Sequence, residues 1–101
     1  MMKPQDAQTV YKEIVAHIKK QSGSYSKWYA GIASDWEDRL FVDHQVPKEH
    51  YWYIARQCHN DEDARAVEKS LHSLGCDGSF GGGDPTTVYV YAYLKSGVTN
   101  P

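Results

Sequence analysis

Residues 86–94, TTVYVYAYL, constrain the fold more than any other segment, because small apolar residues and tyrosines alternate in it without a break. Strict alternation predicts an antiparallel β-strand with one face in a core. We expect the other face to be covered by a helix, with the N-terminal helix as candidate, or to form an interface with a protein partner. The core face carries Val88, Val90, Ala92 and Leu94, and the other face carries Tyr89, Tyr91 and Tyr93.

Two amphipathic helices are predicted, over residues 4–20 and 60–74, because apolar residues recur there at steps of three and four. Asp6 is the candidate cap of the first helix, and Asn60 or Asp61 caps the second. Gly75 supplies the C-terminal stop of the second helix. The two stripes consist of Ala7, Val10, Tyr11, Ile14, Val15 and Ile18, and of Ala64, Val67, Leu71 and Leu74.

Two further strands are predicted at residues 27–32 and 50–56, which are rich in aromatic and β-branched residues. Gly31 marks a bulge or a close backbone approach. Between the strands, Ser34 and Glu37 have the spacing of a capping box, so a helix should begin at Ser34.

The order helix, strand, helix, strand, helix, strand predicts an α+β domain. We expect a small, mostly antiparallel three-stranded sheet packed by about three helices. Residues 1–101 form one domain, in which residues 1–22 contain the N-terminal helix, 27–95 form the core and 96–101 form a flexible tail.

Glu68 lies within or at the edge of the apolar stripe of the last helix, four residues after Ala64 and three before Leu71. A carboxylate in such a place is unfavourable unless it is paired or bound to a cation. Two interpretations stay open, a functional carboxylate and a boundary glutamate whose head reaches water or pairs with Arg39 or Arg56.

The stretch from residue 27 to 44 carries Tyr29-Ala30-Gly31-Ile32, a short turn, Arg39-Leu40 and then His44. It resembles the second half of the GIY-YIG nuclease motif, in which a strand ending in Tyr-x-Gly precedes a helix with an arginine and often a histidine. Residues 52–55 and 60–68 resemble the third strand of that superfamily and its helix with a metal-binding glutamate. The resemblance covers about residues 27–75 and implies a GIY-YIG-like fold.

The resemblance implies a metal-dependent nucleic-acid phosphodiester hydrolase with Mg²⁺ or Mn²⁺ as cofactor. It implies that Glu68 is the metal ligand, Arg39 the phosphate clamp, Tyr29 the residue that positions or deprotonates the nucleophile, and His44 an auxiliary proton-transfer group. A hard cation prefers oxygen ligands, and arginine presents a bidentate fork to phosphate. Arg39 and Glu68 should therefore reach one cleft with Tyr29, and a Glu68 on the opposite side of the sheet from Arg39 would exclude the shared site.

The sequence departs from the family pattern at three points. No Gly-Ile-Tyr strand precedes Tyr29, and His44 follows Arg39 by one residue more than the family spacing. The late asparagine of active members has no clear counterpart, because Asn100 sits at the C-terminus. A non-catalytic GIY-YIG-like module for protein or weak nucleic-acid interaction is therefore the alternative.

The two cysteines, Cys58 and Cys76, are expected to be free thiols. A zinc alternative would combine them with His59 and His72, although adjacent ligands such as Cys58 and His59 are unlike the usual spacing. The glycine-rich segment from residue 75 to 85 lacks the Walker and Rossmann patterns, so we interpret it as a connection, with a direct ligand role as the alternative.

The charge balance gives no global signal for nucleic acid, since the net charge is −2 and the pI is near 6.2. No basic residues interleave with the tyrosines of residues 86–94, which disfavours a base-stacking platform. No apolar run is long enough to span a bilayer, and the first residues lack the apolar stretch of a signal peptide. We expect a soluble, cytoplasmic protein with no membrane partner.

Overall fold

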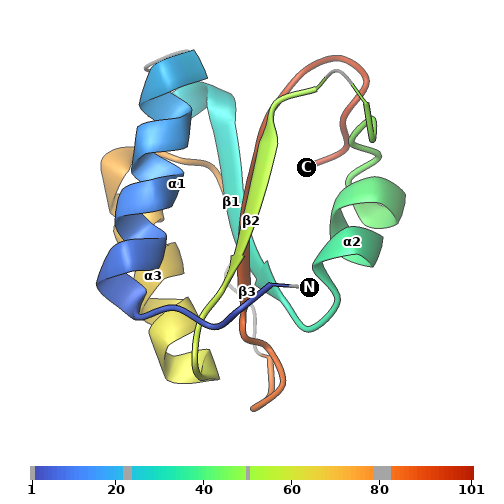
Figure 1. Cartoon of the computed structure of the whole chain (residues 1–101). Coiled ribbons are helices and arrows are strands. Elements are labelled where there is room, and N and C mark those ends of the chain that lie inside the picture. The colour runs from blue at the N-terminus through green and yellow to red at the C-terminus, as the bar shows by residue number, and fades with distance from the viewer. Residues whose placement is uncertain (1, 22–23, 50, 79–82) are drawn as a thin grey trace.

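The sheet has three strands, and its central strand is the last in the sequence (Figure 1). The computed structural model describes residues 2–21, 24–49, 51–78 and 83–101. The strands are β1 (Trp28–Ala33), β2 (Tyr53–Gln57) and β3 (Tyr89–Leu94), in the order β1-β3-β2 and antiparallel throughout. The predicted α+β domain with three helices around a three-stranded antiparallel sheet is confirmed.

Helices α1 (Ala7–Gln21) and α3 (Asp61–Leu74) lie side by side on one face of the sheet (Figure 1). The Asp6 carboxylate accepts a hydrogen bond from the Thr9 amide at 2.8 Å, and Asn60 caps α3 in the same way. Gly75 ends α3 in the left-handed conformation, with φ of 119°, which glycine adopts without a steric penalty. The predicted caps and stop of these helices are thus confirmed.

The other face of the sheet is covered by α2 (Trp36–Asp38) and the wider π-turn η2 (Arg39–Asp43), which continue one another. A short 3₁₀ turn, η1 (Tyr25–Lys27), leads into β1. The cap of α2 is Asp35 and not the predicted Ser34, because the Asp35 carboxylate accepts the Asp38 amide at 3.1 Å. The capping-box prediction was therefore wrong by one residue.

Two predicted details of the strands, the start of β3 and the bulge at Gly31, differ in the structure. β3 begins at Tyr89 and not at residue 86, because the Asp84 carboxylate accepts the Thr86 amide at 2.8 Å and holds the preceding residues in a turn. β1 pairs with β3 in an unbroken register in which Gly31 faces Tyr91, so Gly31 is not a bulge.

Each face of the sheet has its own cluster of buried side chains. The cluster under α1 and α3 is apolar and includes Val10, Ile14, Ile18, Val67, Leu71, Val90 and Ala92. The cluster under α2 and η2 includes Tyr29, Leu40, Val46, Tyr91 and Tyr93. The alternation of β3 was predicted correctly, but its tyrosine face is covered by residues 36–46 and not by the N-terminal helix, because α1 packs with α3 on the opposite face.

Three predicted features involve residues outside the described part of the chain. They are His50 of the predicted strand 50–56, residues 22–23 after the N-terminal helix, and residues 79–82 of the glycine-rich segment. Within the described ranges, no helix has both the length and the apolar character needed to cross a membrane.

Candidate functional site

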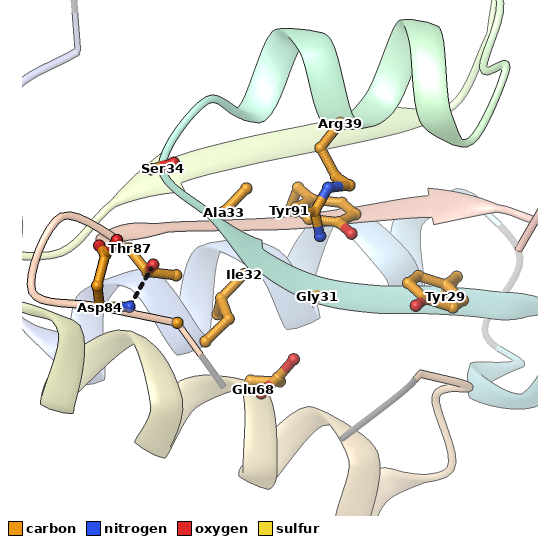
Figure 2. A pocket seen from close by; sticks show the side chains of 11 residues that line it. Tyr29, Gly31, Ile32, Ala33, Ser34, Arg39, Glu68, Asp84, Thr87 and Tyr91 are labelled. Carbon is orange, nitrogen blue, oxygen red and sulfur yellow. Dashed lines mark hydrogen bonds between the residues drawn. The ribbon is translucent and has the colours of Figure 1, made fainter. Parts of the chain in front are cut away.

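A pocket of about 380 Å³ lies at the edge of β1, close to its C-terminal end (Figure 2). It brings together side chains from β1, β3, α3, the start of η2 and the turn before β3. Three of the four predicted site residues are among them. The lining residues are Tyr29, Gly31, Ile32, Ala33, Ser34, Arg39, Glu68, Gly83, Asp84, Thr87 and Tyr91.

Arg39 and Glu68 reach this pocket from helices on opposite faces of the sheet. They share it because β1 is an edge strand of the sheet. On its outer side the Asp77 main chain pairs with Trp28 and Ala30, and the pocket extends around the edge of β1 beyond this pairing. Figure 2 shows Arg39 above β1 and Glu68 below it. Both side chains line the pocket together with Tyr29. Glu68 nevertheless lies on the opposite side of the sheet from Arg39 (Figure 2), which is the arrangement that was expected to exclude a shared site, so the two meet only around the outer edge of β1.

Tyr91 on β3 is a pocket residue that the sequence did not single out. It faces Gly31 across the β1–β3 pair, and its ring occupies the space that a side chain at Gly31 would fill. A Cβ atom at Gly31 would lie 2.5 Å from the Tyr91 hydroxyl oxygen. Gly31 therefore lets the hydroxyl reach the pocket, and the close approach at Gly31 is made by a side chain and not, as predicted, by a backbone segment.

The alternation of residues 86–94 could have placed Tyr91 on one face with Tyr89 and Tyr93. The alternation could not have placed Tyr91 beside Tyr29, because this neighbourhood requires β3 to lie between the two earlier strands. The strand order is set by packing between distant segments and leaves no short-range pattern in the sequence.

Arg39 supplies positive charge at the pocket and makes an exposed ion pair with Asp43, with 3.1 Å between Nε and Oδ2. The Arg39 guanidinium lies beside the Tyr91 hydroxyl in Figure 2. Burial raises the pKa of Tyr91, and the positive charge of Arg39 opposes that rise. The Tyr91 hydroxyl is therefore protonated at neutral pH and lies against a cation.

Glu68 is half-buried, and burial raises the pKa of its carboxyl against the opposing charges of His72 and Arg65. Its predicted structural partners are occupied elsewhere, since Arg39 pairs with Asp43 and Arg56 pairs with Glu13 at 2.7 Å. Among the described residues, no ion pair within 4.0 Å involves Glu68.

The pocket carries the carboxylates of Glu68 and Asp84, and Asp84 already accepts the Thr86 amide. No group of three or more His, Cys, Asp or Glu that could hold a metal ion occurs in the described ranges.

His44 does not line the pocket but lies directly behind it, with only 6% of its surface exposed. Its Nε2 atom is 2.7 Å from the Tyr91 hydroxyl oxygen. Burial lowers the pKa of His44, which favours the neutral ring. His44 follows the wide turn of η2, in which its amide donates to the Arg39 carbonyl at 3.0 Å.

The zinc candidates do not gather into a site. Cys58 and Cys76 are buried free thiols, and burial raises the pKa of each to about 11. The His72 Nε2 atom lies 2.9 Å from the Ala30 carbonyl oxygen, and His59 is exposed. These four residues include no group of three that could hold a metal ion.

The glycine-rich segment contributes Gly83 and Asp84 to the pocket wall. Asp84 holds a turn with Thr86 and Thr87, in which the Thr87 amide donates to the Asp84 carbonyl at 3.0 Å. The Thr86 hydroxyl and the Thr86 amide both donate to the Asp84 carboxylate, and these two hydrogen bonds lower the pKa of Asp84, so its carboxylate is ionised at neutral pH. The pocket thus pairs one cationic side with a carboxylate-bearing side.

Comparison of the chain with protein-family models, with curated proteins and with solved structures finds no match.

Proposed function

We propose that this pocket binds and hydrolyses a phosphodiester of nucleic acid with the help of Mg²⁺ or Mn²⁺, as the resemblance to GIY-YIG nucleases implies. The observation that supports the proposal most is that Tyr29, Arg39, Glu68 and Tyr91 line one pocket, although they come from four separate elements. An arginine can stabilise a transferring phosphoryl group, and a carboxylate can hold the cation that such reactions commonly use.

Arg39 is the group that would hold the phosphate. Its pair with Asp43 is exposed, and such pairs contribute only about 0–1 kcal/mol. A bidentate bond to a phosphate can therefore replace it. The Tyr91 hydroxyl beside Arg39 would then lie close to the bound phosphate.

Glu68 is the group that would hold the cation. Its raised pKa reflects an ionised form that lacks solvent, and a cation would restore the lost stabilisation. Once bound there, Mg²⁺ or Mn²⁺ would polarise the phosphoryl oxygens and stabilise developing negative charge.

Tyr29 and Tyr91 are the groups that would position the attacking water. In this proposal, Tyr91 takes the place of the tyrosine that the family carries on a strand before Tyr29. The chain lacks that strand in front, but β3 occupies the position beside β1 and presents a phenol to the pocket. His44 would act through Tyr91, because its Nε2 atom faces the Tyr91 hydroxyl.

A non-catalytic module for protein or weak nucleic-acid interaction is the second candidate. It is favoured by the net charge of −2 and by the existing ion pair of Arg39. Tyr91 and Tyr93 are buried, so the tyrosine face would offer a partner Tyr89 alone. A protein partner would instead contact the exposed apolar residues Val42 and Trp52.

The test is a cleavage assay on supercoiled DNA, single-stranded DNA and RNA with Mg²⁺ or Mn²⁺. We expect cation-dependent cleavage that is lost in Glu68→Gln and in Arg39→Ala. Glu62→Gln and Arg56→Ala are matched controls, because Glu62 is exposed on the same helix and Arg56 is ion-paired outside the pocket. Absence of cleavage on all three substrates by folded protein would reject the hydrolase and favour the interaction module.

A further inference from the structure

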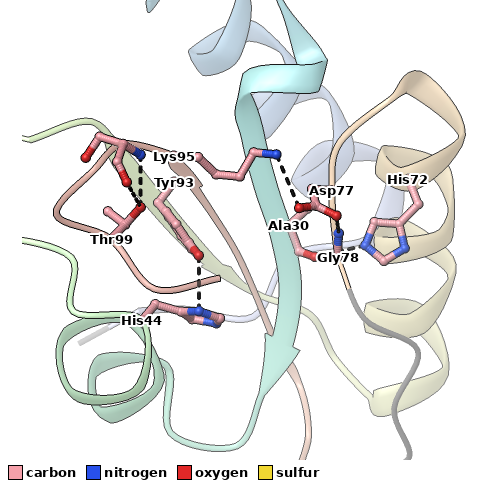
Figure 3. Close-up of polar contacts among 9 residues, drawn as sticks. Ala30, His44, His72, Asp77, Gly78, Tyr93, Lys95 and Thr99 are labelled. Carbon is pink, nitrogen blue, oxygen red and sulfur yellow. Dashed lines mark hydrogen bonds and ion pairs between the residues drawn. The ribbon is translucent and has the colours of Figure 1, made fainter.

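The C-terminal segment folds back onto His44 through a short turn. The Thr99 amide donates to the Ser96 carbonyl at 3.2 Å, and the Ser96 amide donates to the Thr99 hydroxyl at 2.9 Å. The turn brings Asn100 to His44, where the Asn100 amide donates to the His44 carbonyl at 2.7 Å. Figure 3 shows the hydrogen bonds of Thr99 and the Tyr93 hydroxyl pointing at the His44 ring.

The side chain of His44 also meets Asn100. The distance between the His44 Nδ1 atom and the Asn100 carbonyl oxygen is 2.8 Å. A carbonyl oxygen can only accept, so this hydrogen bond requires a hydrogen on Nδ1. In the other neutral tautomer, two acceptors would face one another at that distance. The Tyr93 hydroxyl oxygen is also 3.1 Å from Nδ1, but a hydroxyl can donate or accept and so fits either tautomer. The Asn100 carbonyl, which can only accept, therefore selects the Nδ1–H tautomer of His44.

The selected tautomer fixes the direction of the Tyr91 hydroxyl. With hydrogen on Nδ1, the Nε2 atom carries a lone pair and accepts the Tyr91 hydroxyl hydrogen across 2.7 Å. Arg39 agrees with this assignment, because its guanidinium lies beside the Tyr91 oxygen and has donors only. Both neighbours leave the lone pairs of Tyr91 directed away from His44.

We propose that the turn of residues 96–100 is a positioning element of the pocket, in which the Asn100 main-chain carbonyl holds His44 as the Nδ1–H tautomer and so turns the lone pairs of Tyr91 toward the pocket. The use of those lone pairs, to accept a hydrogen bond from the attacking water, rests on the proposed function. The tautomer of His44 does not depend on it.

The chain offers a matched set of variants, because both contacts of Asn100 are made by its main chain. Asn100→Ala keeps the carbonyl and the amide. Asn100→Pro removes the amide that docks the turn onto the His44 carbonyl. Deletion of residues 100–101 removes both groups.

The test is the imidazole ¹⁵N spectrum of His44 in the full chain, assigned with His44→Gln. We expect the Nδ1–H pattern in wild type and in Asn100→Ala, and a mixture of tautomers in Asn100→Pro and in the deletion variant. An Nε2–H pattern in wild type would overturn the proposal, as would an unchanged Nδ1–H pattern after the deletion.

A second measurement separates this inference from the proposed function. If the chain cleaves nucleic acid, the deletion should slow cleavage by roughly tenfold, less than the loss of a direct general acid or base because Asn100 acts through His44 and Tyr91, and Asn100→Ala should not slow it. Unchanged cleavage after the deletion would contradict the positioning role even with a mixed tautomer. If no substrate is cleaved, the proposed function fails, and the spectrum alone decides the role of the turn.

Discussion

The two faces of the sheet bury different chemistry. Under α1 and α3 the cluster consists almost wholly of aliphatic side chains, such as Ile14 and Val90, which need no partners. Under α2 and η2, tyrosine hydroxyls and the imidazole of His44 are buried. The His44 ring lies within hydrogen-bond distance of three groups, on Tyr91, Tyr93 and Asn100. Burying polar groups is favourable only when they are hydrogen-bonded, so one face supports the fold and the other holds an ordered polar network.

The largest effect should come from the apolar face. Ile14 is fully buried in α1, and Ile14→Ala should lower the free energy of unfolding by about 2–5 kcal/mol, because it removes apolar contacts and leaves a cavity. Urea denaturation measures the change, with the exposed Lys12→Ala on the same helix as control. A decrease in the free energy of unfolding for Tyr93→Phe as large as that for Ile14→Ala would contradict the distinction between an apolar face that stabilises the fold and a polar face that does so less.

Gly31→Ala tests the contact between β1 and the Tyr91 side chain at the pocket. The new methyl group would clash with the Tyr91 hydroxyl, so we expect a loss of about 1–3 kcal/mol in the free energy of unfolding, typical of overpacking. Gly97→Ala is the control, because a Cβ atom there has nothing within 4 Å. Equal stability of the two variants in urea would show that Tyr91 does not depend on the gap at Gly31.

The polar face should carry a pH dependence through His44, which is surrounded by Arg39, Asp43 and the phenols of Tyr29, Tyr91 and Tyr93. At pH 7.5, His44→Gln should lower the free energy of unfolding by about 1–3 kcal/mol, because buried hydrogen-bonding groups lose their partner.

The difference between wild type and His44→Gln should shrink as the pH falls below 6.5. The lowered pKa of His44 means that its stabilisation is complete above the unfolded value of 6.5 and is lost as the pH falls toward the folded value. Denaturation at a series of pH values measures this. Burial also lowers the pKa of His17, so His17→Gln is the control that should leave the His44 component in place. A constant difference across the range would contradict a buried neutral His44.

The smallest expected change in the free energy of unfolding is an increase, and it comes from replacing Glu68. The raised pKa of Glu68 means that its ionised form destabilises the fold above the folded pKa and that the destabilisation is absent below 4.5. Glu68→Gln should therefore raise the free energy of unfolding at pH 7 by on the order of 0.5 kcal/mol, a difference that vanishes near pH 4. Glu62→Gln should show neither effect.

Mn²⁺ sharpens the test of Glu68. A cation that binds the folded chain raises its thermal midpoint by mass action. We expect a higher midpoint for wild type in Mn²⁺ and no increase for Glu68→Gln. An equal increase in both proteins would place the cation away from Glu68.

The sequence predicted what depends on local pattern. The Asn60 cap and the Gly75 stop of α3 lie where expected, since each depends on residues within a few positions. Of the predicted stripe, Ala64, Val67 and Leu71 are buried, but Leu74 in the last turn is exposed. The same locality produced an error at Ser34, because Asp35 is an equally good cap and the sequence alone does not choose between adjacent candidates. The ends of most helices and strands were thus predictable to within a few residues.

The site was predictable only in part. Tyr29, Arg39 and Glu68 were named and do line one pocket, but Tyr91 was not, because its place depends on β3 lying between β1 and β2. The helix that covers the tyrosines was also predicted wrongly, because periodicity indicates that a face is buried but does not indicate which element covers it. The contact of His44 with Asn100 spans 56 residues and has no local signal at all.

Tyr91→Phe and Tyr93→Phe, compared for nucleic-acid cleavage in Mg²⁺, test the central claim most directly. Both variants lose one hydroxyl that lies within hydrogen-bond distance of His44, but only the Tyr91 hydroxyl faces the pocket. We predict a loss of about 100-fold for Tyr91→Phe, in the range of general acid–base effects, and near wild-type cleavage for Tyr93→Phe. Equal rates for the two variants would contradict a pocket that acts through Tyr91.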